Sequence, residues 1–135
     1  MTTTTPAGVA RAYIEAVGAH DLDTVDGLLA ESLQARIGAG SSDKEQWMAA
    51  LGRLLPALVR NDIRDVYENG DHACVVYDFV TDTSAGAVVC VENVHVAGGR
   101  ITDIELVFDK VAFAPVNEAL KERAAASAEA SATAG

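Results

Sequence analysis

The prevailing spacing of apolar residues differs between the first and the second part of this chain, and that change limits the folds available to it. Up to about Leu58, apart from Leu33–Ile37, apolar residues recur every three or four positions, as on one face of a helix. From Ile63 to Phe108 they tend to alternate with polar residues, as on a strand with one buried face. The sequence therefore predicts helices first and then consecutive strands, which is an α+β arrangement.

Two helices and a short strand are expected in the first part of the chain. Thr5 and Pro6 suit the cap and the first position of a helix that extends to about Ala19. Asp21 can cap a short second helix, and the alternation over Leu33–Ile37 predicts a strand after it.

A third helix is expected after a glycine-containing turn. Ser42 and Glu45 have the spacing of a capping box, in which the side chain of each residue accepts a hydrogen bond from the backbone N–H of the other. The apolar face of this helix extends to Leu58, and Pro56 should kink its last turns.

Four strands separated by turn sequences are expected in the second part. Glycine, asparagine and aspartate cluster between the alternating segments, as in tight turns. The predicted strands are Ile63–Tyr67, Ala73–Val80, Ala87–Val96 and Arg100–Phe108.

The strand Ala87–Val96 carries a carboxyl group, Glu92, inside an apolar run. An ionised carboxylate is rarely buried without a partner, because desolvation is costly. Glu92 therefore either faces solvent or a neighbouring polar group, or lies in a cavity with a raised pKa that suits acid/base chemistry.

The pairing of this strand with the preceding one decides which neighbours Glu92 has. A two-residue loop at Ser84 and Ala85 would place Glu92 directly opposite Tyr77. One face of the pair then carries Val75, Tyr77, Phe79, Cys90, Glu92 and Val94. The other face carries Cys74, Val76, Asp78, Val89, Val91, Asn93 and His95, a mixed surface that suits a homodimer interface.

Composition excludes some classes of partner. The 135 residues carry a net charge of −10, which argues against nucleic acid and against anionic membranes. The first six residues lack the features of a signal peptide, and no apolar run approaches the roughly 20 residues of a membrane span. A cytoplasmic protein with two free thiols, no cofactor and no metal site is expected.

The length suits one domain with a proper core. We assign residues 1–114 to this domain. The alanine-rich segment 115–135 is expected to form a helical or disordered tail.

Several short segments resemble the ketosteroid isomerase and SnoaL-like polyketide cyclase branch of the nuclear transport factor 2-like superfamily. They are Arg11–Val17 with Asp21 and Leu22, Cys90–Val94, Gly99–Ile101 and Leu106–Phe108. The resemblance runs from about Val9 to Asp109. It implies a cone-shaped α+β barrel, with three N-terminal helices packed on a curved, mainly antiparallel sheet.

The resemblance also implies roles for particular residues. Tyr13 matches a tyrosine that lines the isomerase pocket, and Glu92 matches the acid that donates a hydrogen bond to a dienolate oxygen. Phe108 matches an aromatic residue that packs on the ligand. The isomerases carry their proton-shuttling aspartate where this chain has Ile37, so steroid isomerisation is not expected. Cyclases of the branch are similar in relying on one pocket carboxylate, a role that Glu92 can fill.

Two functions remain open at this point. One is a cofactor-independent enzyme of isomerase, cyclase or dehydratase type, with Glu92, Tyr13 and Tyr77 as its catalytic residues. The other is a non-catalytic ligand-binding or dimerisation module of the same fold. In both, a hydrophobic small molecule would contact the candidate binding residues Trp47, Phe79, Phe108, Ile37 and Leu106.

Overall fold

The computed structural model describes residues 5–134 of the chain. Residues 1–4, on which part of the signal-peptide prediction rests, and Gly135 lie outside the described residues. The helices are α1 (Pro6–Gly18), α2 (Leu22–Leu28), α3 (Lys44–Leu54) and α4 (Lys110–Ala134), with a 3₁₀ turn, η1 (Leu55–Ala57), after α3. The strands are β1 (Leu29–Ile37), β2 (Gly40–Ser42), β3 (Leu58–Asn69), β4 (His72–Thr81), β5 (Ala87–Ala97) and β6 (Arg100–Phe108).

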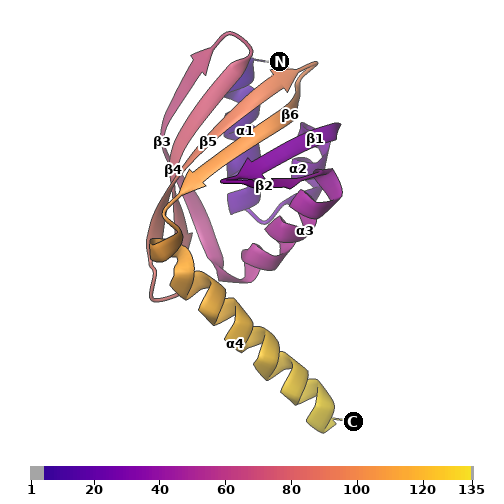
Figure 1. Cartoon of the computed structure of the whole chain (residues 1–135), viewed down its shortest axis with the longest axis vertical. Coiled ribbons are helices and arrows are strands. Elements are labelled where there is room, and N and C mark those ends of the chain that lie inside the picture. Colours follow the sequence, from indigo (N-terminus) through magenta and orange to yellow (C-terminus); the bar gives the residue numbers. More distant parts are fainter. Residues whose placement is uncertain (1–4, 135) are drawn as a thin grey trace.

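The six strands form one mixed sheet in the order β2-β1-β6-β5-β4-β3. β1 runs parallel to β6, and the other neighbouring pairs are antiparallel. The sheet is curved and stays open, with β2 and β3 at its edges, and α1 and α3 pack on its inner face (Figure 1). The α+β class, the three N-terminal helices and the mainly antiparallel sheet are as predicted.

The helix starts follow from the capping residues. Thr5 accepts a bond from the backbone N–H of Gly8 at 3.1 Å, with Pro6 at the first helical position. The cap of α3 is Asp43, not Ser42: its carboxylate accepts the Gln46 N–H at 2.9 Å, while the Gln46 side chain accepts the Asp43 N–H at 3.0 Å. The predicted Ser42–Glu45 box was wrong because an aspartate one position later satisfies the same backbone groups.

Two strands are longer than predicted, and one was missed. β1 begins at Leu29, directly after α2. β3 begins at Leu58, because Pro56 ends the helical segment in the turn η1 where a continued kinked helix was expected. β2, three residues long, was not predicted and pairs with the end of β1.

The register between β4 and β5 differs from the prediction by two residues. Glu92 lies opposite Val75, and Tyr77 lies opposite Cys90. The connection is longer than a two-residue loop, since the last pair is Val80 with Ala87. A shift of two keeps every side chain on its predicted face, so Tyr77 and Glu92 are still on the same side of the sheet as diagonal neighbours.

The inner face of the sheet and one side of α1 form the core. Tyr13 and Ile14 of α1 are almost fully buried, as are Val75 on β4 and Val94 on β5. Gly18, at the end of α1, allows a close approach to β3, because a Cβ there would lie 2.8 Å from the backbone nitrogen of Asn61. The concave side of the sheet is therefore the place where an internal site can form.

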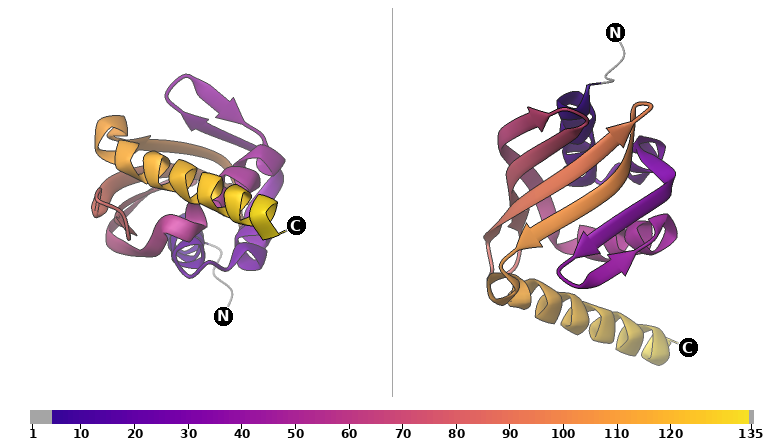
Figure 2. Two further views of the ribbon diagram at one scale, coloured as in Figure 1. Left: turned by 90° about the horizontal axis from the view of Figure 1, so that it is seen from below. Right: turned by 45° about the horizontal axis from the view of Figure 1, so that its top comes forward.

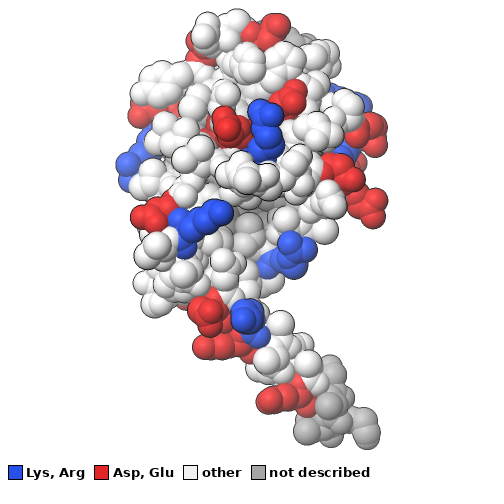
Figure 3. All heavy atoms as spheres, viewed as in Figure 1, with Lys and Arg blue, Asp and Glu red and all other residues white. Residues whose placement is uncertain are grey.

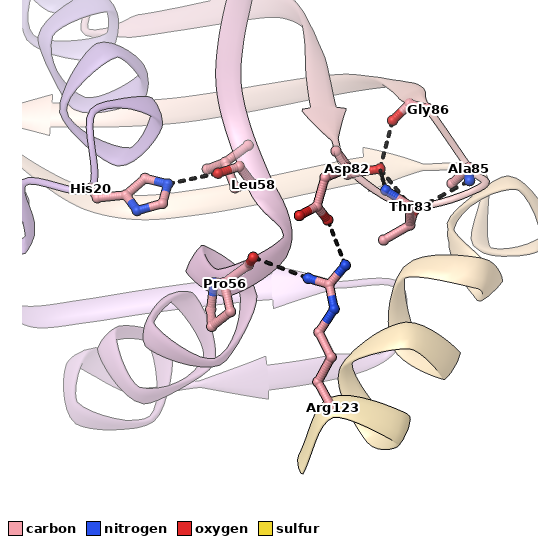
Figure 4. Close-up of polar contacts among 9 residues, drawn as sticks. His20, Pro56, Leu58, Asp82, Thr83, Ala85, Gly86 and Arg123 are labelled. Carbon is pink, nitrogen blue, oxygen red and sulfur yellow. Dashed lines mark hydrogen bonds and ion pairs between the residues drawn. The ribbon is translucent and has the colours of Figure 1, made fainter. Parts of the chain in front are cut away.

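α4 starts against the folded body and then projects away from one end of it (Figures 1 and 2). Phe113 and Val116, in its first turns, are buried, so the helix crosses the boundary predicted at residue 114 without a break. Farther along, Arg123 donates to the carbonyl of Pro56 at 3.1 Å and to the carboxylate of Asp82 at 2.8 Å (Figure 4). The described part of the predicted tail is helical, although no helix within residues 5–134 is long and apolar enough to cross a bilayer.

Candidate active site

A cavity of about 300 Å³ lies between the inner face of the sheet and helices α1 and α3. The start of α4 forms a further part of its wall, through Lys110, Phe113 and Asn117. The eight candidate residues from the sequence all line this cavity: Tyr13, Ile37, Trp47, Tyr77, Phe79, Glu92, Leu106 and Phe108. Their roles in binding or catalysis stay predictions.

Glu92 presents its two carboxyl oxygens to different surroundings. It is 2 % exposed. Oε1 accepts a hydrogen bond from the Tyr77 hydroxyl at 2.5 Å, while Oε2 is buried and has no hydrogen-bond partner among the described residues. An unpaired buried carboxyl oxygen is costly, so Oε2 is available to a group that enters the cavity.

Tyr13 forms a second polar centre beside Glu92. Its hydroxyl oxygen accepts a hydrogen bond from the indole N–H of Trp47 at 3.0 Å. Because the oxygen accepts this bond, the tyrosine O–H remains a donor, and hydrogen bonds in such a chain strengthen one another. Trp47 therefore orients the phenol of Tyr13 as well as forming part of the apolar wall.

Burial controls the ionisation of this cluster. It raises the pKa of Glu92 from 4.5 to about 7, and the hydroxyls of Tyr77 and Tyr13 offset part of that effect by stabilising the carboxylate. Burial, together with the charge of Glu92, raises the pKa of both tyrosines well above the usual value. Near neutral pH the tyrosines are donors, and Glu92 populates both its acid and its base form.

The rest of the cavity is largely apolar. Phe113 packs against Phe79 and Phe108, with ring centroids 5.7 Å and 5.0 Å away. Burial raises the pKa of the Cys90 thiol to about 12, so this wall residue is a neutral thiol and not a nucleophile at neutral pH.

Three polar cavity residues were missed from the sequence. Asn61 is on the part of β3 that was not predicted to be a strand; its amide N–H donates to the Ile14 carbonyl at 3.0 Å, and its Oδ1 is buried without a partner among the described residues. Lys110 and Asn117 were missed because the start of α4 was not expected to reach the cavity. No periodic signal in the sequence marks any of the three.

Comparison with known families decides the group to which this chain belongs. The profile of the SnoaL-like domain matches residues 10–104. The chain belongs to the SnoaL-like family. A search of the curated proteins found no significant match.

Several solved structures share this fold. A protein from Kribbella flavida matches with a TM-score of 0.76 and 24% identity, over 90% of this chain and 99% of that one. IdmH, a candidate polyketide cyclase from Streptomyces antibioticus, matches with a TM-score of 0.67 and 16% identity, over 84% and 98%. A candidate ketosteroid isomerase from Kribbella flavida matches with a TM-score of 0.68 and 14% identity, over 77% of each chain. At these identities the similarity shows the fold alone.

The SnoaL-like cavity of this protein holds one carboxyl group. Among the described residues that line it, Glu92 is the sole aspartate or glutamate, and Ile37 occupies the end of β1.

Proposed function

We propose that the chain binds a hydrophobic small molecule in the cavity and acts on it by acid/base chemistry at Glu92, without a cofactor. The observation that carries this proposal is the unpaired Oε2 of a buried carboxyl group that lines an apolar cavity. The fold family includes proteins described as candidate isomerases and cyclases, which agrees with this type of chemistry.

The geometry supports one order of proton movements. Tyr77 occupies Oε1, so Oε2 is the atom that takes a proton from a carbon next to a carbonyl group of the ligand. The electron pair of that C–H bond moves toward the carbonyl oxygen, which becomes an enolate. Tyr13, whose hydroxyl is oriented by Trp47, donates to this oxygen. The proton on Oε2 then returns to the ligand at the same or another carbon, which completes an isomerisation or assists a ring closure or dehydration.

The pKa of Glu92 suits this double role. A general base works best when its pKa is near the working pH, because it is then available and still basic enough. A carboxyl group with a pKa of about 7 meets this condition, whereas an exposed glutamate does not.

Hydrogen exchange with a simple ketone tests the proposal without knowledge of the natural substrate. We expect the protein to bind 1-decalone and to speed deuterium uptake at the carbons beside its carbonyl group. The protein-dependent rate should rise with pH and level off above about pH 7, following the base form of Glu92. Glu92→Gln should lower this rate by at least about 100-fold and leave binding within a few-fold.

Glu105→Gln is the matched control, because Glu105 is exposed on β6 and does not line the cavity. It should leave the exchange rate unchanged. Binding of 1-decalone with no protein-dependent exchange would favour the non-catalytic binding module. Equal exchange rates in the two variants would remove Glu92 from the chemistry.

A further inference from the structure

A second hollow continues outward from the cavity, between α3 and α4. This groove is bordered by the end of α3, by Pro56 in η1 and by one side of α4 from Asn117 onward. It shares Ala50, Leu54 and Asn117 with the cavity wall. A ligand too long for the cavity would therefore extend into this groove.

The groove is lined by basic side chains in a strongly acidic protein. Arg53, Lys121 and Arg123 line it, and Lys110 lies at the adjoining cavity wall. No aspartate or glutamate lines the groove in the described part of the chain, although the full chain has a net charge of −10. Figure 3 shows the hollow between the body and α4, with Lys and Arg side chains around it and Asp and Glu side chains next to some of them.

Three of these four cations are free of ion pairs. Arg53, Lys110 and Lys121 have no ion-pair partner among residues 5–134, as is also true of Arg36 and Arg100 elsewhere on the protein, whereas the other five basic residues are paired. Grouping like charges without a counter-charge is unfavourable, and an anion bound between them relieves the repulsion.

Arg123 instead holds α4 in position beside the groove. Its guanidinium bonds to Pro56 and Asp82 fix α4 against η1 and the end of β4 (Figure 4). Basic and acidic residues lie on different faces of α4. Glu118 and Glu122 line a shallow depression near Thr83 and Ser84, away from the groove.

We propose that the ligand of the cavity is an amphipathic organic anion whose negative group lies in this groove, near Arg53, Lys110 and Lys121. This inference rests on the proposed function, since the apolar part of the same molecule would occupy the cavity beside Glu92. Carboxylate, sulfonate and phosphate groups share the required chemistry, which is a compact negative charge on an apolar body.

A pair of dyes that differ by one charge tests the inference. 6-Anilinonaphthalene-2-sulfonate and the neutral N-phenyl-2-naphthylamine share an apolar body, and both report binding by fluorescence. We expect the full-length protein to bind the sulfonate at least ten-fold more tightly than the neutral compound at low salt. At 1 M salt this ratio should fall toward one, because screening acts on the charged compound alone.

Variants that lack the basic side chains at the groove test whether these cause the preference for the sulfonate dye. Arg53→Gln/Lys110→Gln/Lys121→Gln should reduce the ratio below two-fold; because the ratio compares both dyes on the same variant, an effect of Lys110 on the cavity itself cancels. The control Arg11→Gln/Arg36→Gln/Arg100→Gln removes the same total charge from residues that line neither hollow, and it should keep the ratio.

Each result decides between the proposals. Binding of the neutral dye without a preference for the sulfonate, or an unchanged ratio in the groove variant, overturns the inference and leaves the cavity proposal intact. Failure of the wild-type protein to bind either dye contradicts both proposals. If the groove variant does not fold, the salt dependence of the wild-type ratio still decides, and a salt-independent ratio counts against the anion site.

Discussion

At the scale of single residues, the chemistry of the site depends on the two oxygens of Glu92. Tyr77 satisfies Oε1, and Oε2 is buried without a hydrogen-bond partner among the described residues. Burial makes the charged form costly and raises the pKa to about 7, despite the two hydroxyl groups that favour the carboxylate. The burial that makes Glu92 a usable base therefore also makes its ionised form destabilise the folded protein.

This destabilisation predicts that the free energy of unfolding depends on pH differently in the wild type and in Glu92→Gln. The folded-state pKa is raised above the unfolded value of 4.5, so the folded protein holds the proton more tightly. The stabilising contribution is complete below pH 4.5 and is lost as the pH rises to about 7. Urea unfolding should show the free energy of unfolding of the wild type falling by about 3 kcal/mol relative to the variant between pH 4 and pH 8. Parallel pH profiles would contradict the burial of an ionisable Glu92.

The residues of the site were largely predictable from the sequence because strand alternation has a period of two. The connection between β4 and β5 is longer than expected and moved the register, yet an even shift kept Tyr77 and Glu92 on one face. Asn61 was not predictable in this way, since it belongs to an edge strand whose pairing with β4 is interrupted by two irregularities.

At the scale of elements, local capping decides where α3 begins. Sequence spacing predicted a capping box that starts at Ser42. The structure has one that starts at Asp43, in which Asp43 and Gln46 bond reciprocally. Similarly, the apolar pattern around Pro56 and Leu58 fits both a helix and a strand, and pairing of Leu58 with Thr81 favours the strand.

The choice of cap gives a prediction with a built-in control. Asp43→Ala should lower the free energy of unfolding by about 1 kcal/mol, because it leaves the first backbone N–H groups of α3 without an acceptor. Ser42→Ala should change it by less than about 0.5 kcal/mol, because the Ser42 side chain is not the cap. Chemical denaturation of both variants measures the difference, and the reverse ranking would show that α3 begins at the Ser42 box.

At the scale of the whole molecule, the outer face of the sheet is the surface on which we expect a second copy to bind. Val89 and Val107 are 45% and 60% exposed there, on the adjacent strands β5 and β6. Asp78, on the same face, is paired with Arg64. The exposed valines on this face suit self-association more than contact with a charged polymer.

Homodimerisation is therefore predicted, and one substitution should disrupt it. Light scattering at micromolar concentration should give the mass of a dimer for the wild type and of a monomer for Val107→Lys, because a lysine at the interface must lose its hydration shell. Val111→Lys, at a still more exposed valine on α4, should remain dimeric. A monomeric wild type would contradict the prediction.

The state of Glu92 is the claim on which the proposed chemistry depends most, and its titration can be measured directly. With ¹³C-labelled glutamate carboxyl groups, an NMR titration should show one signal with a midpoint near pH 7 that is absent from Glu92→Gln. That result would establish an acid/base group suited to neutral pH inside the cavity. If every glutamate signal instead titrates near pH 4.5, Glu92 is an ordinary carboxylate, and the proposed catalytic role fails.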